Sequence, residues 1–258
     1  MIIEYHRPEN LDQAKRLLDR TTPLTIPLGG GTVISRHTDV PVAVVDLQSL
    51  GLNKVSIVRN TCRIGAMTRL QDLVENMNLP GSLRRAALRE ANINIRRSAT
   101  IGGLLMKADG HSPLLGCLLS LDINITWEPG KISVSLEDWL KRERQKKPGK
   151  LITEITFTIP VETGYEDVAR SPQDRPIVFV TTTRWETGGV RIVFGGSGNA
   201  PVLASESYGN KIIEFFSKRS LSDQIVKSEY SDYQRAAIQI LIKRTVQQKE
   251  HFGGKELS

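Results

Sequence analysis

Two glycine-dense stretches constrain this chain more than any other feature of its 258 residues. The first is Pro27-Leu28-Gly29-Gly30-Gly31-Thr32-Val33-Ile34, and the second is Arg96-Arg97-Ser98-Ala99-Thr100-Ile101-Gly102-Gly103. Glycine adopts backbone conformations that other residues avoid, and it leaves its N–H group accessible. A concave row of N–H groups binds phosphate oxygens without a basic side chain. We therefore interpret each stretch as a tight turn, the second at a strand end, and together they predict a site for a long anionic cofactor. Two ordinary structural turns are the alternative.

Neither stretch has the pattern of the common nucleotide-binding loops. No Gly-Lys-Ser or Gly-Lys-Thr triplet follows Gly29–Gly31, so the lysine of a P-loop is missing. Ile34 stands where the third glycine of a dinucleotide-binding fingerprint belongs. The sequence therefore excludes both motifs.

The composition argues against several other classes of protein. The net charge is +7, but much of the positive charge lies in the segment 141–150, which is typical of a solvated loop, so nucleic acid binding is not expected. The two cysteines, Cys62 and Cys117, are too few for an iron–sulfur cluster, and their apolar neighbours predict buried, reduced thiols. No apolar run reaches about 18 residues, so no membrane span is expected. The N-terminus lacks a signal-peptide pattern, which favours the cytoplasm.

The pattern of apolar residues predicts a mixed helix and strand chain. Asn10 begins a capping box, so a helix is expected from about Leu11 to Asp19. Thr68 and Ser82 are expected to cap two further helices. The other helices are expected over 114–121, 136–140 and much of the last third. Strands are expected over 24–28, 42–47, 55–58, 62–66, 123–127, 132–134, 152–159, 177–182 and 190–194.

Two features of the second half complete this prediction. The polar, proline-bearing segment 161–176 is a plausible domain boundary. In the last third, six residues fall at helical spacing and predict one packed helix face, and the residues from His251 onward are expected to be a frayed tail. The six are Tyr233, Ala236, Ala237, Ile240, Leu241 and Thr245.

Across nearly its whole length the sequence resembles the FAD-binding medium subunit of the molybdenum hydroxylases, the family of xanthine dehydrogenase and carbon monoxide dehydrogenase. The resemblance rests on Tyr5-His6-Arg7-Pro8, Leu28–Thr32, Ile95–Gly103 and Phe194–Pro201. It implies an α+β fold, with an FAD-binding PCMH-type domain of two α/β subdomains over residues 1–160. A C-terminal domain over residues 165–258, with a small antiparallel sheet and a helical bundle, is expected to follow.

The resemblance also implies an electron-transfer function. A molybdenum-cofactor subunit hydroxylates the substrate, an iron–sulfur subunit conducts the electrons, and FAD on this oxidoreductase chain passes them to NAD or another acceptor. No catalytic residue and no metal ligand are implied for this chain. Leu28–Val33 would cradle the pyrophosphate, Thr100–Gly103 would lie beside the phosphates and the ring, and Leu151 or Ile152 would face the isoalloxazine. The implied cofactor-binding residues are Leu28, Gly29, Gly30, Gly31, Thr32, Val33, Thr100, Ile101, Gly102, Gly103, Leu104, Leu151 and Ile152.

Three residues depart from the family pattern. Leu104 stands in place of an asparagine, Pro113 in place of an aspartate that contacts FAD, and Glu166 in place of a lysine. These departures motivate a second hypothesis, in which the chain is a degenerate paralogue that holds a complex together with weak or no FAD binding. Replacement of Gly102 and Gly103 by valine is expected to abolish flavin retention, because side chains would block the approach of the backbone.

Overall fold

The structure is a computed structural model of the chain, and it describes residues 1–33, 40–142, 149–171, 174–208, 230–247 and 250–251. The chain forms two compact units, each assembled from several segments. The first contains Met1–Asp72, Ile93–Lys107 and Asn124–Phe157, and the second contains Leu73–Asn92, Ala108–Ile123 and Thr158–Ser258. Both units mix helices and strands, which confirms the α+β class.

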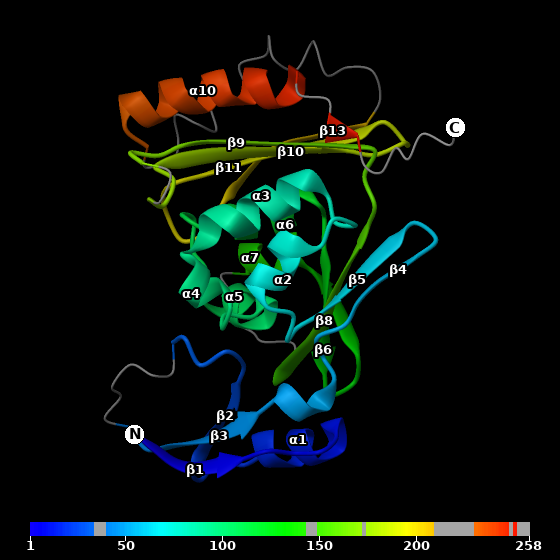
Figure 1. Ribbon diagram of the computed structural model, residues 1–258, viewed down its shortest axis with the longest axis vertical. Coiled ribbons are helices and arrows are strands. Elements are labelled where there is room, and N and C mark those ends of the chain that lie inside the picture. Colours follow the sequence, from blue (N-terminus) through cyan, green and yellow to red (C-terminus); the bar gives the residue numbers. More distant parts are fainter. Residues whose placement is uncertain (34–39, 143–148, 172–173, 209–229, 248–249, 252–258) are drawn as a thin grey trace. The chain divides into compact units, whose positions relative to one another are not determined.

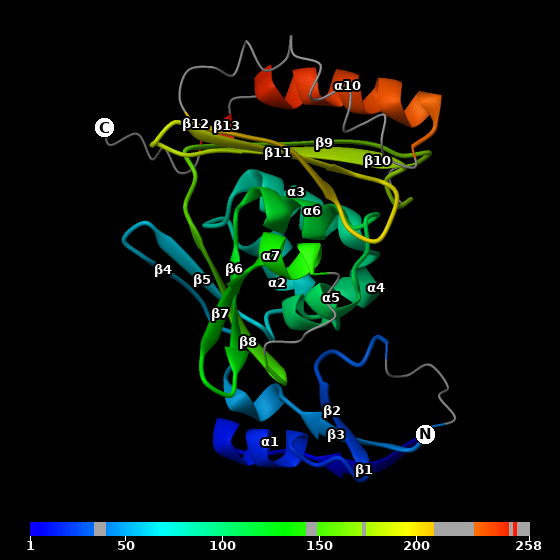
Figure 2. The same ribbon diagram turned by 180° about the vertical axis from the view of Figure 1, so that it is seen from behind.

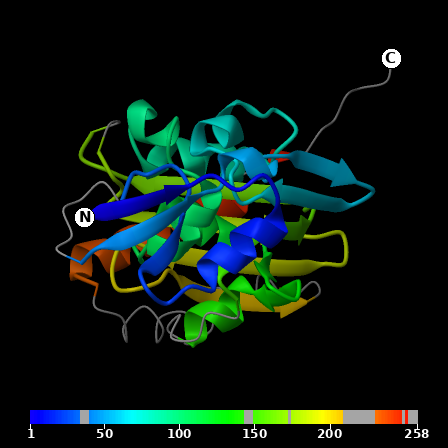
Figure 3. The same cartoon turned by 90° about the horizontal axis from the view of Figure 1, so that it is seen from below.

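The first unit begins with a small parallel sheet. Its strands are β1 (Ile2–His6), β3 (Val42–Asp46) and β2 (Leu24–Leu28), in that order. Helix α1 (Leu11–Leu18) begins as predicted, because the Asn10 side chain accepts a hydrogen bond from the Gln13 N–H group. Helix α1 lies beside this sheet (Figures 1 and 3), and Ala14 and Leu18 are buried in one cluster with Val45. The predicted helix and the strands expected over 24–28 and 42–47 are confirmed, and β1 adds a strand that was not expected.

A second sheet completes the first unit, with strand order β4-β5-β8-β6-β7 (Figure 2). The predicted hairpin is present as an antiparallel β4–β5 pair. Trp127 and Trp139 pack edge to face, with ring centroids 5.3 Å apart, and so join β6 to α7. The strands are β4 (Val55–Val58), β5 (Thr61–Gly65), β8 (Leu151–Thr158), β6 (Asn124–Glu128) and β7 (Ile132–Ser135). The helical elements are the 3-10 turn Gln48–Leu50, α4 (Ile93–Arg96), α5 (Ile101–Lys107) and α7 (Leu136–Lys141), while α2 (Leu70–Glu75) is divided between the two units.

The second unit is an antiparallel sheet with helices on both faces, in the order β12-β11-β10-β9-β13 (Figure 1). Strand β10 alternates between the two faces. Val178 and Val180 share a core cluster with Ile238 of α10, whereas the hydroxyls of Thr181 and Thr183 each lie 3.0 Å from Ser120 Oγ of α6. The strands are β9 (Glu162–Val168), β10 (Val178–Arg184), β11 (Gly189–Gly195), β12 (Val202–Tyr208) and β13 (Glu250–His251). The helices are α3 (Gly81–Glu90), α6 (Pro113–Ser120) and α10 (Asp232–Gln247).

The structure corrects the interpretation of the second glycine stretch. It is not at a strand end, because α4 precedes it, and Gly102 and Gly103 lie in the first turn of α5. The first N–H groups of a helix have no acceptor within the helix. Here the N–H groups of Ile101 and Gly102 donate to carbonyl groups of a neighbouring segment.

Two predicted helix caps are also wrong. Helix α2 begins at Leu70, and the Thr68 hydroxyl has no hydrogen-bond partner among the described residues. Gln71, three residues after Thr68, accepts a hydrogen bond from Arg96. Helix α3 begins at Gly81 after Pro80, so Ser82 lies inside it, with its hydroxyl 3.6 Å from the Cys117 sulfur. In neither case does the predicted side chain cap the helix.

Further findings concern the second unit. The polar segment 161–176 contains strand β9, which pairs along its length with β10, and its role as a domain boundary stays a prediction. The last third contains β12 as well as a helix. On α10, Tyr233 and Ile240 are 61% and 52% exposed, because the buried face is centred on Ile238 and Leu241. The segment 143–148 and residues 252–258 lie outside the described residues, so the predicted basic loop and frayed tail are largely not covered.

The prediction of two buried, reduced thiols is confirmed. Both Cys62 and Cys117 are buried free thiols. In the part of the chain that the structure describes, no helix is long and apolar enough to cross a membrane.

Candidate functional site

The first glycine stretch follows an edge strand of the parallel sheet. The Leu28 carbonyl accepts a hydrogen bond from the Leu47 N–H group at 3.1 Å, and β2 ends there. Gly31 has a φ of 72°, a left-handed conformation that favours glycine. Within the described residues, the N–H groups of Gly29, Gly30 and Gly31 donate no hydrogen bond to the protein. The turn therefore presents three backbone donors to a ligand.

The two glycine stretches pack directly against each other within the first unit. A Cβ atom on Gly30 would lie 1.7 Å from the Ser98 carbonyl oxygen, and one on Gly29 would lie 2.8 Å from Thr100 Oγ1. Gly30 therefore requires glycine because the backbone of the second stretch approaches it, whereas Gly29 faces a side chain of that stretch. The structure thus brings together Leu28–Val33 and Thr100–Gly103, which lie about 70 residues apart in the sequence.

The second stretch uses most of its N–H groups inside the protein. The N–H groups of Ile101 and Gly102 donate to the carbonyl oxygens of Thr68 and Ala66, at 3.0 and 2.9 Å. The Gly103 N–H group has a longer contact of 3.3 Å with Thr100 Oγ1. This stretch is therefore a wall that supports the first turn, and it is not a second row of free donors.

This geometry changes the expected effect of replacing Gly102 or Gly103 of α5 by valine. A Cβ on Gly102 would lie 3.0 Å from the Ala66 carbonyl oxygen, so a side chain there collides first with the protein. Gly103 is exposed, and a Cβ there would meet only Thr100 Oγ1, at 3.3 Å. A substitution at Gly103 therefore tests ligand approach more directly than one at Gly102.

The apolar residues assigned to the flavin ring are buried. Leu151 and Ile152 of β8 are 3% and 5% exposed, and Leu151 belongs to the core cluster of α1 and β3. Met67 packs against the same cluster, and its sulfur would lie 3.8 Å from a Cβ on Gly29. Leu104 of α5 is 9% exposed. The contact of Leu151 or Ile152 with the ring stays a prediction.

Each residue that departs from the family pattern has a local structural role. Pro113 is the first residue of α6, after Ser112, whose side chain caps that helix. Glu166 of β9 lies 3.7 Å from the guanidinium of Arg85. Leu104 is part of the buried core. Leu104 therefore serves packing, Pro113 begins a helix, and Glu166 forms an ion pair.

Sequence reasoning missed the residues that hold the second stretch in place. Ala66 links it to β8, because its own N–H group donates to the Thr153 carbonyl at 2.8 Å. Arg96 is 8% exposed, and its Nε donates to Gln71 Oε1 at 3.0 Å. Burial lowers the pKa of Arg96. These contacts join residues about 25 and 90 positions apart, so no local sequence signal marks them.

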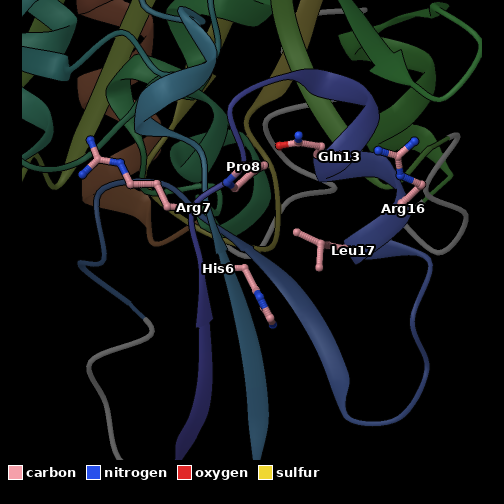
Figure 4. Close-up of a pocket in the computed structure, with 6 residues that line it drawn as sticks. All are labelled: His6, Arg7, Pro8, Gln13, Arg16 and Leu17. Carbon is pink, nitrogen blue, oxygen red and sulfur yellow. The ribbon is translucent and has the colours of Figure 1, made fainter.

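A separate cleft of about 390 Å³ lies between the end of β1 and α1, and none of the predicted cofactor residues lines it (Figure 4). Arg7 points away from the other lining side chains, and its Nε donates to Ser49 Oγ at 2.7 Å. The lining residues are His6, Arg7, Pro8, Gln13, Arg16 and Leu17. Among the described residues, no group of three or more histidine, cysteine, aspartate or glutamate side chains could hold a metal ion.

The donor set of the first turn fits the diphosphate of FAD. Three neighbouring N–H groups without a protein acceptor match an anion with several oxygen acceptors. The close approach of Gly30 to Ser98 holds the turn in place before any ligand binds.

Comparison with known proteins connects this site to one family. The sequence profile described as "FAD binding domain in molybdopterin dehydrogenase" matches residues 1–161. The protein YgfM of Escherichia coli K12 is 30% identical over 200 residues, which are 76% of this chain and 75% of that protein. The carbon monoxide dehydrogenase medium chain of Afipia carboxidovorans is 27% identical over 224 residues, with 79% and 77% covered. The 6-hydroxypseudooxynicotine dehydrogenase complex subunit alpha of Paenarthrobacter nicotinovorans is 27% identical over 225 residues, with 79% and 76% covered.

Solved structures share the fold over almost the whole chain. A chain of reconstituted CO dehydrogenase from Oligotropha carboxidovorans matches with a TM-score of 0.75 at 20% identity, covering 94% of this chain and 96% of that one. A chain of quinoline 2-oxidoreductase from Pseudomonas putida 86 matches with a TM-score of 0.74 at 16% identity, covering 94% and 95%.

Proposed function

Because this chain belongs to the family of FAD-binding domains of molybdopterin dehydrogenases, we propose that it is the flavin-carrying electron-transfer subunit of a molybdenum hydroxylase complex. It is an oxidoreductase subunit with FAD as its cofactor. Electrons would arrive from an iron–sulfur subunit, which receives them from a molybdenum-cofactor subunit, and would leave to NAD or another acceptor. The observation that carries this proposal is the turn at Gly29–Gly31, whose three N–H groups have no acceptor in the described protein.

In this proposal the chain binds and orients the cofactor and does no acid–base chemistry. FAD supplies the ability to accept electrons singly and release them as a pair. The N–H groups of Gly29, Gly30 and Gly31 would hold its diphosphate. The second stretch would keep the turn fixed through the contact between Gly30 and Ser98. Leu151 and Ile152, carried over from the resemblance, would provide an apolar wall for the ring.

The companion subunits are proposed from two observations. Relatives of similar coverage are named as the medium chain of one dehydrogenase and as subunit alpha of another dehydrogenase complex. The described residues of this chain provide neither a cluster of metal ligands nor a pair of exposed thiols. We therefore place the iron–sulfur and molybdenum centres on separate chains of a cytoplasmic assembly.

Three residues favour a second candidate function, that of a structural paralogue with weak or no FAD binding. Leu104, Pro113 and Glu166 replace polar residues of the family pattern, and each has a packing, capping or ion-pair role of its own. A hydrogen bond to a buried ligand group contributes about 0.5–1.5 kcal/mol. Loss of three would weaken FAD by about one to three decades, while the backbone donors of the first turn would remain.

Purification of the intact complex from its native source separates the two candidates. The proposed function predicts one FAD per chain, with iron and molybdenum in the same complex, and loss of the oxidised flavin absorbance when the substrate of the complex is added under anaerobic conditions. A complex that contains iron and molybdenum but no flavin would favour the structural paralogue. A chain that purifies with neither centre would contradict both.

A further inference from the structure

The β4–β5 hairpin leaves the second sheet of the first unit with an open edge. In the strand order β4-β5-β8-β6-β7, strand β4 has only β5 as a neighbour among the described residues. Figures 1, 2 and 3 all show the tip of the hairpin extending beyond the other strands of this sheet. An edge strand presents unpaired backbone groups, to which another strand can bond.

The backbone groups on this open edge belong to Val55 and Ile57. The Gly65 N–H group donates to the Lys54 carbonyl at 2.9 Å, so these two residues form a hydrogen-bonded pair of the hairpin. Hydrogen-bonded and non-hydrogen-bonded pairs alternate along an antiparallel ladder, so Val55 and Ile57 point their N–H and carbonyl groups away from β5. The edge therefore offers two donors and two acceptors to an added strand.

The side chains of β4 also fit a further strand. Val55 and Ile57 lie on the same sheet face as their cross-strand partners, the buried Ile64 and Cys62. Ile57 is nevertheless 38% exposed, and Val58, on the opposite face, is 59% exposed. Strand β4 contains neither proline nor a charged residue, which are common protections of an edge. An added strand would cover its β-branched side chains.

Basic residues stand at both ends of this edge. Lys54 directly precedes β4, Arg59 directly follows it, and both are exposed. Residues 47–71 contain two further arginines and no aspartate or glutamate. The carboxylate of Glu154 lies 3.3 Å from one of these arginines, Arg63. Neither Lys54 nor Arg59 forms an ion pair with a described residue, so positive charge remains at the two ends of the strand.

These charges discriminate between the possible occupants of the edge. A second copy of β4 could bond in the antiparallel register that places Val55 of one copy opposite Ile57 of the other. That register would bring Lys54 of each copy beside Arg59 of its partner, and like charges this close repel. A strand with carboxylates at both ends would meet the same positions with opposite charge.

We propose that the β4 edge is a docking site for an extended, carboxylate-flanked segment of another protein chain, which adds to the five-stranded sheet as an antiparallel sixth strand. The outward backbone groups of Val55 and Ile57 would bond to this segment. Lys54 and Arg59 would pair with its carboxylates. The inference does not rest on the proposed function, because no residue of the hairpin belongs to the candidate cofactor site.

The test uses the full chain and two capped peptides, each with alternating valine and threonine residues between charged ends. The acidic peptide has two glutamates at each end, and the basic peptide has two lysines there. Titrations followed by backbone amide NMR give the affinities at low and high ionic strength. Amide hydrogen exchange at Val55 and Ile57 measures strand addition directly, because an N–H group that becomes hydrogen-bonded exchanges more slowly.

Two variants separate backbone pairing from charge. Ile57→Pro removes one outward N–H group, at a position where an edge strand tolerates proline. Lys54→Glu with Arg59→Glu reverses the charge at both ends. Lys243→Glu with Arg244→Glu is the matched control for this double variant, because both residues are exposed on α10 and the change in net charge is the same. Far-ultraviolet spectra and unfolding midpoints verify that the proteins are folded.

The proposal predicts that the wild type binds the acidic peptide at least about tenfold more tightly than the basic one. The acidic peptide should slow exchange at Val55 and Ile57, and high salt should reduce the preference, because salt screens exposed charges. Ile57→Pro should bind the acidic peptide more weakly than wild type does. The charge-reversed variant should prefer the basic peptide, whereas the matched control keeps the wild-type preference, and this comparison holds even if Ile57→Pro does not fold.

A wild type that binds neither peptide would overturn the proposal, because the basic residues would then only protect the edge from other strands. Binding without slower exchange at Val55 and Ile57, or a charge-reversed variant that keeps the wild-type preference, would also overturn it. So would a dimer of the free chain in which these two N–H groups are already protected, because a second copy would then occupy the edge.

Discussion

The contact between Gly30 and Ser98 makes the sharpest single-residue prediction. In Gly30→Ala, the new methyl group would lie 1.7 Å from the Ser98 carbonyl oxygen and 2.5 Å from its carbonyl carbon. Ordinary contact begins at 3.4 Å, so the two stretches have to move apart by about 1.7 Å. Both colliding atoms belong to the backbone, so a change of side-chain rotamer cannot relieve the clash.

This displacement affects both the fold and the cofactor. Overpacking of this kind costs about 1–3 kcal/mol of unfolding free energy. A shift of that size also breaks any hydrogen bond that the turn makes to a diphosphate. A hydrogen bond to a charged group is worth about 1.5–3 kcal/mol, so the loss of one weakens FAD about 10- to 100-fold.

The assay measures FAD affinity by fluorescence titration and stability by urea unfolding of the FAD-free chain. Gly51→Ala is the control, because Gly51 lies outside the candidate cofactor site and a Cβ there meets no atom of the described residues within 4 Å. Its φ of 66° costs alanine about 1–2 kcal/mol, but the two glycine stretches keep their contact, so FAD affinity should stay that of wild type. If Gly30→Ala matches wild type in both FAD affinity and unfolding free energy, the packing of the two stretches is refuted.

The remaining predictions concern the cofactor wall and the buried groups. Leu104→Asn should bind FAD about 2- to 10-fold more tightly, by restoring one polar contact, and unchanged or weaker binding in a titration would contradict the role assigned to that position. Burial raises the pKa of Glu90, whose carboxylate accepts hydrogen bonds from Ser112 Oγ and the Leu114 N–H group. The folded state therefore favours the protonated form, so the wild type should lose unfolding free energy relative to Glu90→Gln as the pH rises from acid towards neutral, and parallel stability curves would refute this. Burial raises the pKa of Cys62 to about 12, so neither it nor Cys117 should react with a thiol reagent until the chain unfolds.

Local sequence patterns predicted the elements whose form depends on nearby residues. The Asn10 cap fixes the start of α1, and the apolar run before Leu121 forms the buried helix α6. The β4–β5 hairpin and the β10–β11 pair likewise follow from alternation and turn residues. In α1 the spacing of apolar residues also matches the buried face, because the buried residues Ala14 and Leu18 lie one helical turn apart.

The failures arise where a distant contact decides the local structure. Thr68 resembles a cap, but Gln71 bonds to Arg96 instead, and the helix begins two residues later. Tyr233 and Ile240 fit one helical face by spacing, but the sheet packs against the neighbouring face around Ile238. Spacing alone does not tell which apolar face a sheet will cover.

The same limit applies to the candidate site, where local sequence indicates the turns but not the contacts between them. The sequence predicted a tight turn at Gly29–Gly31, and the φ of 72° at Gly31 fits such a turn, while its role in binding a cofactor stays a prediction. Its contact with Ser98, and the uptake of the Ile101 and Gly102 N–H groups by the 66–68 segment, could not be found, because they join segments far apart in the chain. The second stretch was therefore expected to offer donors that it uses internally.

The central claim is that backbone donors of the first turn hold the diphosphate of the cofactor. The most direct measurement compares the affinity of the folded wild-type chain for FAD and for riboflavin, which carries the same ring without phosphate. At about 1.5–3 kcal/mol for each bond to a charged oxygen, the account predicts FAD binding at least about 100-fold tighter, with one FAD per chain. Equal affinities for FAD and riboflavin, or a folded chain that binds neither, would contradict it.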